Sequence, residues 1–353
     1  MDILIPLKKE QDFSYTVSIG DLPEITLDKK VMIVTNPTVG DLHLETLKKH
    51  IHANELYTVM VPDGEDYKNM QSIDLILDAC FEKRLDRKSV MISLGGGVIG
   101  DMTGFASSLY QRGIDFIQVP TTLLSQVDAS VGGKTGINNK YGKNLMGAFH
   151  QPKAVYIDPQ FLKTLPKREY AAGIAEIVKM AVTFDKEFFD FLENADLNND
   201  KDILEAIKRS VQLKANVVAQ DEKEQGIRAA LNYGHTFGHV IENESGYGTY
   251  LHGEAVAIGM IMANKVAVKL GLMSEDDAKR VDKLLNRYDL DTNYVIKDVD
   301  AFYEMFFLDK KSLDNKITFI LPKGLGDVLL TDTIEKETIF EVLASYEKGV
   351  AHA

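Results

Sequence analysis

The chain has 353 residues, one cysteine and a formal net charge of −13. The length predicts about two domains, and the excess of 53 acidic over 40 basic residues argues against general binding to nucleic acid or anionic membranes. Cys80 alone excludes a disulfide framework and a thiolate metal cluster, and it suits a reducing cytoplasm. We expect neither a signal peptide nor a membrane-spanning segment.

Short apolar runs alternate with helical patterns over about the first 160 residues. This alternation predicts a mostly parallel sheet with crossover helices. Helical patterns dominate afterwards, with two late strands near residues 316–331. We predict an α/β fold with a Rossmann-like parallel-sheet domain over residues 1–162 and a mainly α-helical domain over 163–353. The expected strands cover parts of 1–30, 31–40, 57–61, 89–95, 116–122 and 154–159, and the expected helices cover 41–51, 69–83, 167–194, 200–219, 227–244, 253–270 and 274–287.

A glycine-rich turn, GGGVIGD at residues 95–101, follows one predicted strand and precedes a helix. Its glycines would let backbone N–H groups approach a pyrophosphate, although a tight strand-to-helix turn explains the same pattern. The segments DGEDYK at 63–68 and PTT at 120–122 also follow apolar strands. In an open α/β sheet such loops converge on one crevice, which favours a nucleotide site.

The stretch from residue 129 to residue 157 contains no acidic residue but four lysines, Lys134, Lys140, Lys143 and Lys153. A solvated, mobile loop would explain this composition. The small residues between the lysines also suit a loop that holds phosphate, so we expect a local anion site here.

Four polar side chains share one stripe of the helix predicted over 227–244. Arg228, Asn232, His235 and His239 recur at helical spacing on an otherwise apolar segment, and His252 begins the next helix. The stripe could be the solvated face of that helix. Two histidines on adjacent helices could instead form a catalytic metal site with one carboxylate, which leaves a coordination position open for substrate.

The carboxylate candidate is Glu176, which lies in the apolar helical segment AAGIAEIVKMAV. Lys179 lies three residues later on the same face, so an ordinary intrahelical ion pair is the alternative explanation.

Taken together, these segments resemble the 3-dehydroquinate synthase family, and the resemblance runs over nearly the whole chain. The matching segments are DGEDYK, GGGVIGDMTGF, VPTTLLSQVDASVGGKTGIN, GKNLMGAFHQP, AAGIAEIVK, LNYGHTFGHVIE, HGEAVAIGM and LDKK.

The resemblance implies an NAD+-dependent lyase of the shikimate pathway, which leads to chorismate and the aromatic amino acids. Such an enzyme converts 3-deoxy-D-arabino-heptulosonate 7-phosphate into 3-dehydroquinate and phosphate. Transient oxidation by NAD+ permits elimination of phosphate, and reduction and an intramolecular aldol closure follow. The resemblance also implies a cytoplasmic homodimer in which Arg112 reaches the neighbouring subunit's site.

The same resemblance assigns roles to individual residues. Glu176, His235 and His252 would hold one divalent metal, Zn2+ or Co2+. NAD+ would be held by Asp63, Gly64, Glu65, Asp66, Tyr67, Lys68, Gly97, Val98, Ile99, Gly100, Asp101, Thr121, Thr122, Lys134, Lys143, Phe161, Leu162, Lys163 and Thr164. The sugar phosphate substrate would contact Asp128, Lys134, Asn144, Lys179, Lys214, Arg228, Asn232, His239 and either Lys310 or Lys311.

Three other functions remain open on the sequence alone. A related sugar phosphate cyclase would use the same cofactors, and a metal-dependent polyol dehydrogenase would share the architecture. A nucleotide-binding or metal-binding protein without catalysis is the third.

Overall fold

A computed structural model describes residues 12–246, 248–308 and 317–347 of the chain. The strand pattern expected in the first eleven residues lies outside these ranges. The same is true of Lys310 and Lys311, one of which is expected to contact substrate.

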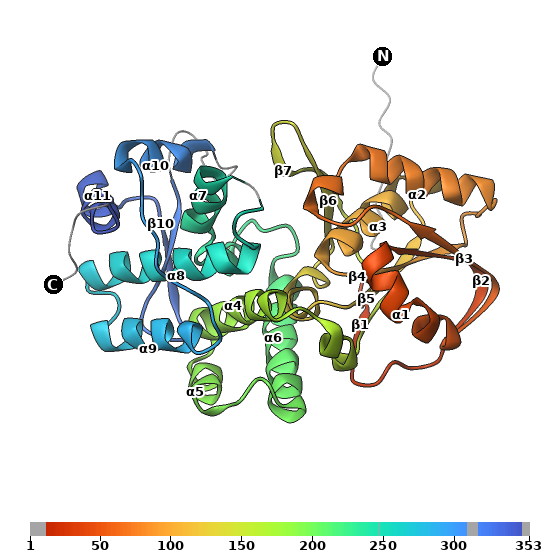
Figure 1. Cartoon of the computed structure of the whole chain (residues 1–353), viewed down its shortest axis with the longest axis horizontal. Helices are drawn as coiled ribbons and strands as arrows, with labels where there is room; N and C mark the ends of the chain where they lie inside the picture. The colour runs from red at the N-terminus through yellow and green to blue at the C-terminus, as the bar shows by residue number, and fades with distance from the viewer. Residues whose placement is uncertain (1–11, 247, 309–316, 348–353) are drawn as a thin grey trace, which may run out of the picture.

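The first half of the chain forms a six-stranded sheet in the order β1-β8-β5-β4-β2-β3 (Figure 1). All neighbouring strands in this sheet are parallel, as the alternating pattern predicts. The order in which the chain adds strands reverses between β2 and β4, because β3 lies on one side of β2 and β4, β5 and β8 follow on the other. Open α/β sheets bind ligands at such a point, outside the carboxyl ends of the strands. The strands are β1 (Thr16–Ile19), β2 (Ile25–Thr35), β3 (Ile51–Met60), β4 (Val90–Gly95), β5 (Asp115–Pro120) and β8 (Ala154–Ile157).

Helices cover both faces of this sheet. Alternate residues of β2 point to opposite sides, so Val31 and Ile33 join the cluster that includes α1 residues. Met32 and Val34 join the cluster that includes residues of α2 and α3. The central strands β4 and β5 and the second half of β2 are therefore buried on both faces and largely apolar, whereas the edge strands β1 and β3 are only partly buried. The helices are α1 (Pro37–Lys49), α2 (Met70–Glu82) and α3 (Gly97–Leu109).

The acid-free stretch is not the irregular loop that its composition predicts. It contains an antiparallel hairpin of β6 (Lys134–Asn139) and β7 (Gly142–Phe149). Gly136 and Gly147 face each other in this hairpin, and a Cβ on Gly147 would lie 2.1 Å from the carbonyl oxygen of Thr135. The hairpin therefore needs glycine at this position for its close backbone approach.

The second half of the chain is mainly helical, and α4 and α6 lie between the two lobes in Figure 1. The helix expected over 167–194 is divided at Asp185, whose side chain accepts a hydrogen bond of 2.9 Å from Phe188 N and starts α5. The elements are α4 (Lys167–Phe184), α5 (Lys186–Asn194), α6 (Asp200–Gln220), α7 (His235–Ser245), α8 (His252–Lys269), α9 (Glu275–Asn286), α10 (Val299–Met305), β9 (Phe319–Pro322), β10 (Val328–Thr331) and α11 (Lys336–Ala344).

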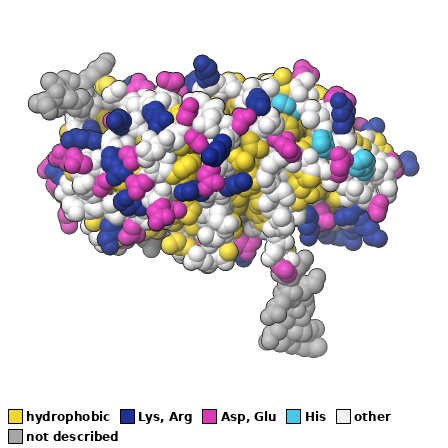
Figure 2. Space-filling view, turned by 90° about the horizontal axis from the view of Figure 1, so that it is seen from below, with side chains coloured by type: hydrophobic (Ala, Val, Ile, Leu, Met, Phe, Trp, Pro, Cys, Tyr) yellow, Lys and Arg dark blue, Asp and Glu magenta, His cyan; other side chains and the backbone are white. Residues whose placement is uncertain are grey.

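A single apolar core fills the helical part, and it also includes Leu123, Val127 and Val155 from the first part of the chain. Among the described residues, no helix is both long and apolar enough to cross a lipid bilayer. Basic and acidic side chains are interspersed over much of the face shown in Figure 2.

Glycine allows α7 and α8 to pack closely. A Cβ on Gly259 of α8 would lie 2.0 Å from the carbonyl oxygen of Gly234, which has a φ of +81° just before α7. Only glycine adopts this left-handed conformation readily, and only glycine at position 259 leaves room for the carbonyl. These two positions set where α7 begins and how near it lies to α8.

Gly259→Ala should therefore push α7 and α8 apart and lower the free energy of unfolding by about 1–3 kcal/mol. Urea unfolding measures this change. Lys269→Ala on the same helix removes a half-exposed ion pair with Glu341 and should cost less than about 1 kcal/mol. If Gly259→Ala were as stable as the wild-type protein, the contact between α7 and α8 would have room for a methyl group, contrary to this prediction.

Candidate active site

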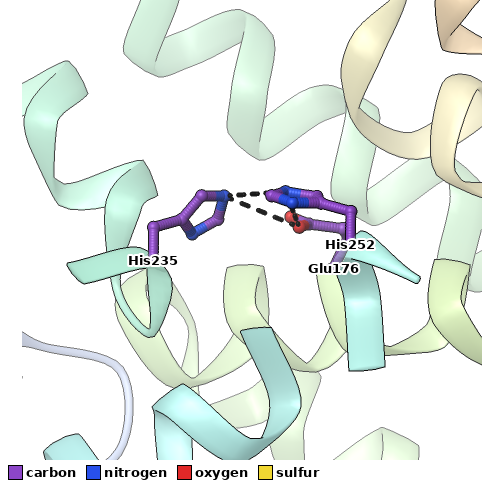
Figure 3. Close-up of side chains that lie close together, drawn as sticks. All are labelled: Glu176, His235 and His252. Atoms are coloured by element: carbon purple, nitrogen blue, oxygen red, sulfur yellow. Dashed lines mark hydrogen bonds and ion pairs between the residues drawn. The ribbon is translucent and has the colours of Figure 1, made fainter. Parts of the chain in front are cut away.

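Three helices bring one carboxylate and two imidazoles together (Figure 3). Glu176 comes from α4, His235 is the first residue of α7, and His252 is the first residue of α8. The two Nε2 atoms are 3.3 Å apart, and Glu176 Oε1 lies 3.8 Å from that of His235 and 3.7 Å from that of His252. The structure thus places the three predicted metal ligands around one point.

The close approach of α8 to α4 depends on Gly253, the residue after His252. A Cβ at Gly253 would lie 2.0 Å from the carbonyl oxygen of Ala172 on α4. Any larger residue would therefore move His252 away from Glu176.

The donor set fits a divalent metal in both geometry and chemistry. Zinc bonds of about 2.0–2.1 Å in a tetrahedron separate two ligand atoms by about 3.3–3.4 Å, close to the distances among these three atoms. His235 Nδ1 lies 3.2 Å from the backbone oxygen of Tyr233, so this nitrogen carries the proton and Nε2 presents a lone pair. Glu176 is 1% exposed, and its Oε1, which faces the two histidines, accepts no hydrogen bond from the described residues.

Lys179 provides the nearest positive charge to this carboxylate. Its Nζ forms an ion pair with Glu176 Oε2, and both side chains are almost completely buried. The intrahelical pair expected from the sequence is therefore present. Lys179 contacts Oε2 of Glu176, whereas Oε1 faces the two histidines. The ion pair and the metal site are therefore compatible.

A second buried charge cluster centres on Asp128, which precedes the acid-free stretch. Asp128 Oδ1 lies 2.9 Å from Lys214 Nζ and 3.9 Å from Lys179 Nζ. Burial alone would raise the pKa of Asp128, but the two ammonium groups outweigh burial and lower this pKa. Burial lowers the pKa of Lys214 despite the nearby Asp128. The carboxylate thus holds two lysines in one place beside the candidate metal site.

Glu224 is a member of the site that sequence reasoning missed. Its Oε2 forms an ion pair with Lys134, and its Oε1 accepts a hydrogen bond of 2.7 Å from Asn232 Nδ2. Arg228 lies between Glu224 and Asn232 in the sequence and is 1% exposed. Its Nη2 donates a hydrogen bond of 2.9 Å to the backbone oxygen of Gly132. No spacing rule identifies Glu224, since its segment is polar throughout.

The stripe expected on one helix over 227–244 is wrong. Residues Ile227–Asn232 form a short 3-10 helix, and α7 begins only at His235. The left-handed Gly234 separates the two segments. His235 and His239 share α7, whereas Arg228 and Asn232 reach the site from the other segment.

Most of the predicted nucleotide residues lie after the carboxyl ends of parallel strands, at one edge of the sheet, whereas Lys134 and Lys143 lie on the β6–β7 hairpin. Residues 63–68 follow β3, residues 97–101 open α3 after β4, residues 121 and 122 follow β5, and residues 161–164 follow β8. Asn36, which the sequence did not mark as a site residue, donates to Asp63 Oδ1 at 2.7 Å and joins the segments that follow β2 and β3. His43 was also missed and contacts Thr164 Oγ1 at 2.8 Å.

Several features of this edge suit a dinucleotide. Gly96 caps α3 without a side-chain hydrogen bond, and a Cβ there would lie 2.9 Å from Thr122. Thr121 Oγ1 is buried and bonds to none of the described residues. Lys68 donates to both Asp101 and Asn144 at 2.6 Å, and thereby joins the nucleotide edge to the hairpin. The pKa of Asp101 is raised by burial, which Lys68 only partly offsets.

Arg112 lies outside this arrangement within its own chain, and the side chain of Lys163 contacts α6. Arg112 is exposed beyond the C-terminal end of α3, the end opposite the glycine turn. Lys163 is exposed and lies 3.7 Å from Asp200 on α6.

A parallel α/β sheet with a glycine turn at its ligand-binding edge, joined to helices that carry two histidines and a glutamate, defines a nucleotide-binding enzyme with a candidate metal centre. Family models for the 3-dehydroquinate synthase N-terminal and C-terminal parts match residues 58–172 and 173–312. The chain therefore belongs to the 3-dehydroquinate synthase family.

Individual relatives agree with this assignment. A 3-dehydroquinate synthase of Sulfurimonas denitrificans is 66% identical over 348 residues, which cover 99% of this chain and 100% of the relative. A 2-epi-5-epi-valiolone synthase structure from Streptomyces hygroscopicus, with NAD+ and Zn2+ bound, superposes with a TM-score of 0.87 at 28% identity over 97% of this chain and 99% of its own. A 2-deoxy-scyllo-inosose synthase complexed with carbaglucose-6-phosphate, NAD+ and Co2+ has a TM-score of 0.82 at 27% identity, covering 93% of this chain and 95% of its own.

Asp128→Asn should destabilise the protein, because Lys179 and Lys214 lose their shared counter-charge. We expect a loss of about 3 kcal/mol at neutral pH, as for a broken buried ion pair. A lowered carboxyl pKa stabilises the fold above the unfolded pKa and loses this contribution as the pH falls. Urea unfolding from pH 7 down to about pH 3.5 should therefore show the gap between variant and wild type shrinking below about pH 4. A gap that is constant with pH would contradict this role of the Asp128 charge.

Proposed function

We propose that this chain catalyses the conversion of 3-deoxy-D-arabino-heptulosonate 7-phosphate into 3-dehydroquinate and phosphate. The observation that carries the proposal is its 66% identity, over nearly its whole length, to a 3-dehydroquinate synthase. The two cyclase structures of other specificity are only 27–28% identical. The site adds three potential metal ligands and a cluster of buried cations that suit a carboxylate and a phosphate.

NAD+ and one divalent metal, Zn2+ or Co2+, complete the proposed site. Glu176, His235 and His252 would hold the metal, and the loops at the carboxyl edge of the sheet would hold the dinucleotide. When bound, NAD+ supplies a hydride acceptor that is restored within each turnover, and the metal supplies a Lewis acid for substrate hydroxyl oxygens.

The chain's own residues bind and orient the substrate. Lys179, Lys214 and Arg228 are buried cations whose positions are fixed by contacts with Asp128 and backbone oxygens. Their fixed charges can bind anionic groups without reorganisation, because they are already oriented before substrate arrives. Positioning of this kind also favours an intramolecular ring closure.

His239 is placed to move a proton near the candidate metal. Its ring centroid lies 5.6 Å from that of His235 and 6.2 Å from that of His252. Histidine is the side chain that most often transfers protons in enzymes, so His239 suits proton transfer to or from substrate.

We further propose a cytoplasmic homodimer built from a nucleotide-binding domain over residues 1–162 and a substrate-binding and metal-binding domain over 163–353. The exposed position of Arg112, away from its own chain's site, supports a contribution to the partner's site. Light scattering on the purified protein tests the dimer. Mixing an Arg112→Ala variant with an inactive His239→Ala variant should restore part of the activity, because one hybrid site then lacks both defects.

Phosphate release from the heptulosonate substrate tests the proposed reaction directly. The metal-loaded protein with NAD+ should release phosphate and accumulate no NADH over full turnovers. Net NADH from a polyol would indicate a dehydrogenase, and phosphate release only from hexose or heptose phosphates that lack a carboxylate would indicate another cyclase. If none of these substrates is turned over, the remaining interpretation is a nucleotide-binding or metal-binding protein without catalysis.

His252→Ala should abolish metal binding and activity together while NAD+ affinity stays within about threefold, because the nucleotide loops lie on other elements. Metal analysis after dialysis and calorimetric titration with NAD+ measure the two effects. His52→Ala on β3, an exposed histidine that pairs with Glu24, is the matched control and should keep both. Stoichiometric metal in His252→Ala would refute the ligand assignment.

A further inference from the structure

Glu242 is a buried carboxylate that the proposed reaction does not use. It lies on α7, three residues after His239, and is 6% exposed. Its Oε1 accepts a hydrogen bond of 2.9 Å from Lys143 Nζ, and its Oε2 lies 3.6 Å from His252 Nδ1. A charge buried this deeply needs such partners, because an unpaired carboxylate in the interior is strongly unfavourable.

The two ring nitrogens of His252 face different groups. Nε2 faces Glu176 and His235, at the distances expected around one metal, whereas Nδ1 faces Glu242. Histidines that bind metals usually donate the hydrogen of their other nitrogen to a carboxylate or a backbone oxygen, which fixes the tautomer and the ring orientation. The second histidine of the site follows this rule through the backbone oxygen of Tyr233. Glu242 is the corresponding group for His252.

We propose that Glu242 is a positioning residue that orients His252 for metal binding. This inference rests on the proposed ligand set. His252 needs such a partner more than His235 does, because its side chain is 37% exposed against 11% for His235. The ring is therefore less constrained by packing, and the carboxylate restricts its rotation.

The ion pair between Lys143 and Glu242 also joins the two parts of the chain. Lys143 lies on β7 of the hairpin, in the first part of the chain, whereas Glu242 and His252 belong to the helical part. One carboxylate thus connects a proposed nucleotide contact with a proposed metal ligand. Any free energy by which this connection couples the two sites acts equally in both directions.

Glu242→Gln tests the inference, because it keeps the shape of the side chain and removes its charge. Metal-free protein is titrated with Co2+ and with Zn2+ against a competing chelator, in the absence of NAD+ and substrate. We expect the dissociation constant to rise by about 10–100-fold, and Glu242→Asp should recover part of the loss. The saturated cobalt spectrum should keep its band positions, since the ligands themselves are unchanged.

Two further variants separate positioning from a general structural effect. Lys143→Met breaks the same ion pair but leaves the carboxylate beside His252, so its metal affinity should stay within about threefold. Glu244→Gln, two residues along α7, removes the charge of a carboxylate that accepts a hydrogen bond from Tyr294 and should not change metal affinity.

The inference is wrong if Glu242→Gln binds metal as tightly as wild type, or if Lys143→Met weakens binding equally. A shifted cobalt spectrum would also overturn it, because Glu242 would then be a ligand itself. If His252→Ala retains metal, the ligand set fails. If it loses metal while Glu242→Gln binds normally, only this inference fails.

Discussion

The buried carboxylate of Glu176 is the constraint on which the rest of the site depends. An ionised group with 1% exposure on an apolar helix is costly unless opposite charge or hydrogen-bond donors surround it. Lys179 forms an ion pair with Oε2 of Glu176, and the two histidines lie close to Oε1. This convergence requires α8 to lie close to both α7 and α4, which the structure achieves with Gly259 at the first contact and Gly253 at the second.

Much of the fold follows from local sequence patterns. Short β-branched runs separated by helical periodicity predict the parallel sheet, since such strands are buried on both faces. Glu176 was identifiable because a glutamate among Ala, Ile and Val is unexpected on a packed helix. The break before His235 was not predictable in this way, because it depends on the left-handed Gly234 and its close contact with Gly259. The β6–β7 hairpin likewise depends on two facing glycines that composition alone marks as loop.

Glu224 and Glu242 show the other limit of sequence reasoning. Acidic residues are frequent in this chain, and neither residue stands out from its neighbours by spacing. Their distinguishing properties are the lysine that each contacts and, for Glu242, its burial. Both properties arise only when segments about a hundred residues apart meet. Long-range charge pairs of this kind need a structure to be recognised, whereas an amphipathic helix does not.

The same pairs bear on whether the two parts of the chain can exist separately. Lys134 and Lys143 project from the hairpin of the first part and contact Glu224 and Glu242 of the second. Residues before position 162 also fill the core of the helical part. A helical fragment produced alone would expose apolar surface and leave Glu242, a carboxylate buried in the whole chain, without Lys143. The two proposed domains therefore share part of their buried surface, and we expect them to unfold together and not one at a time.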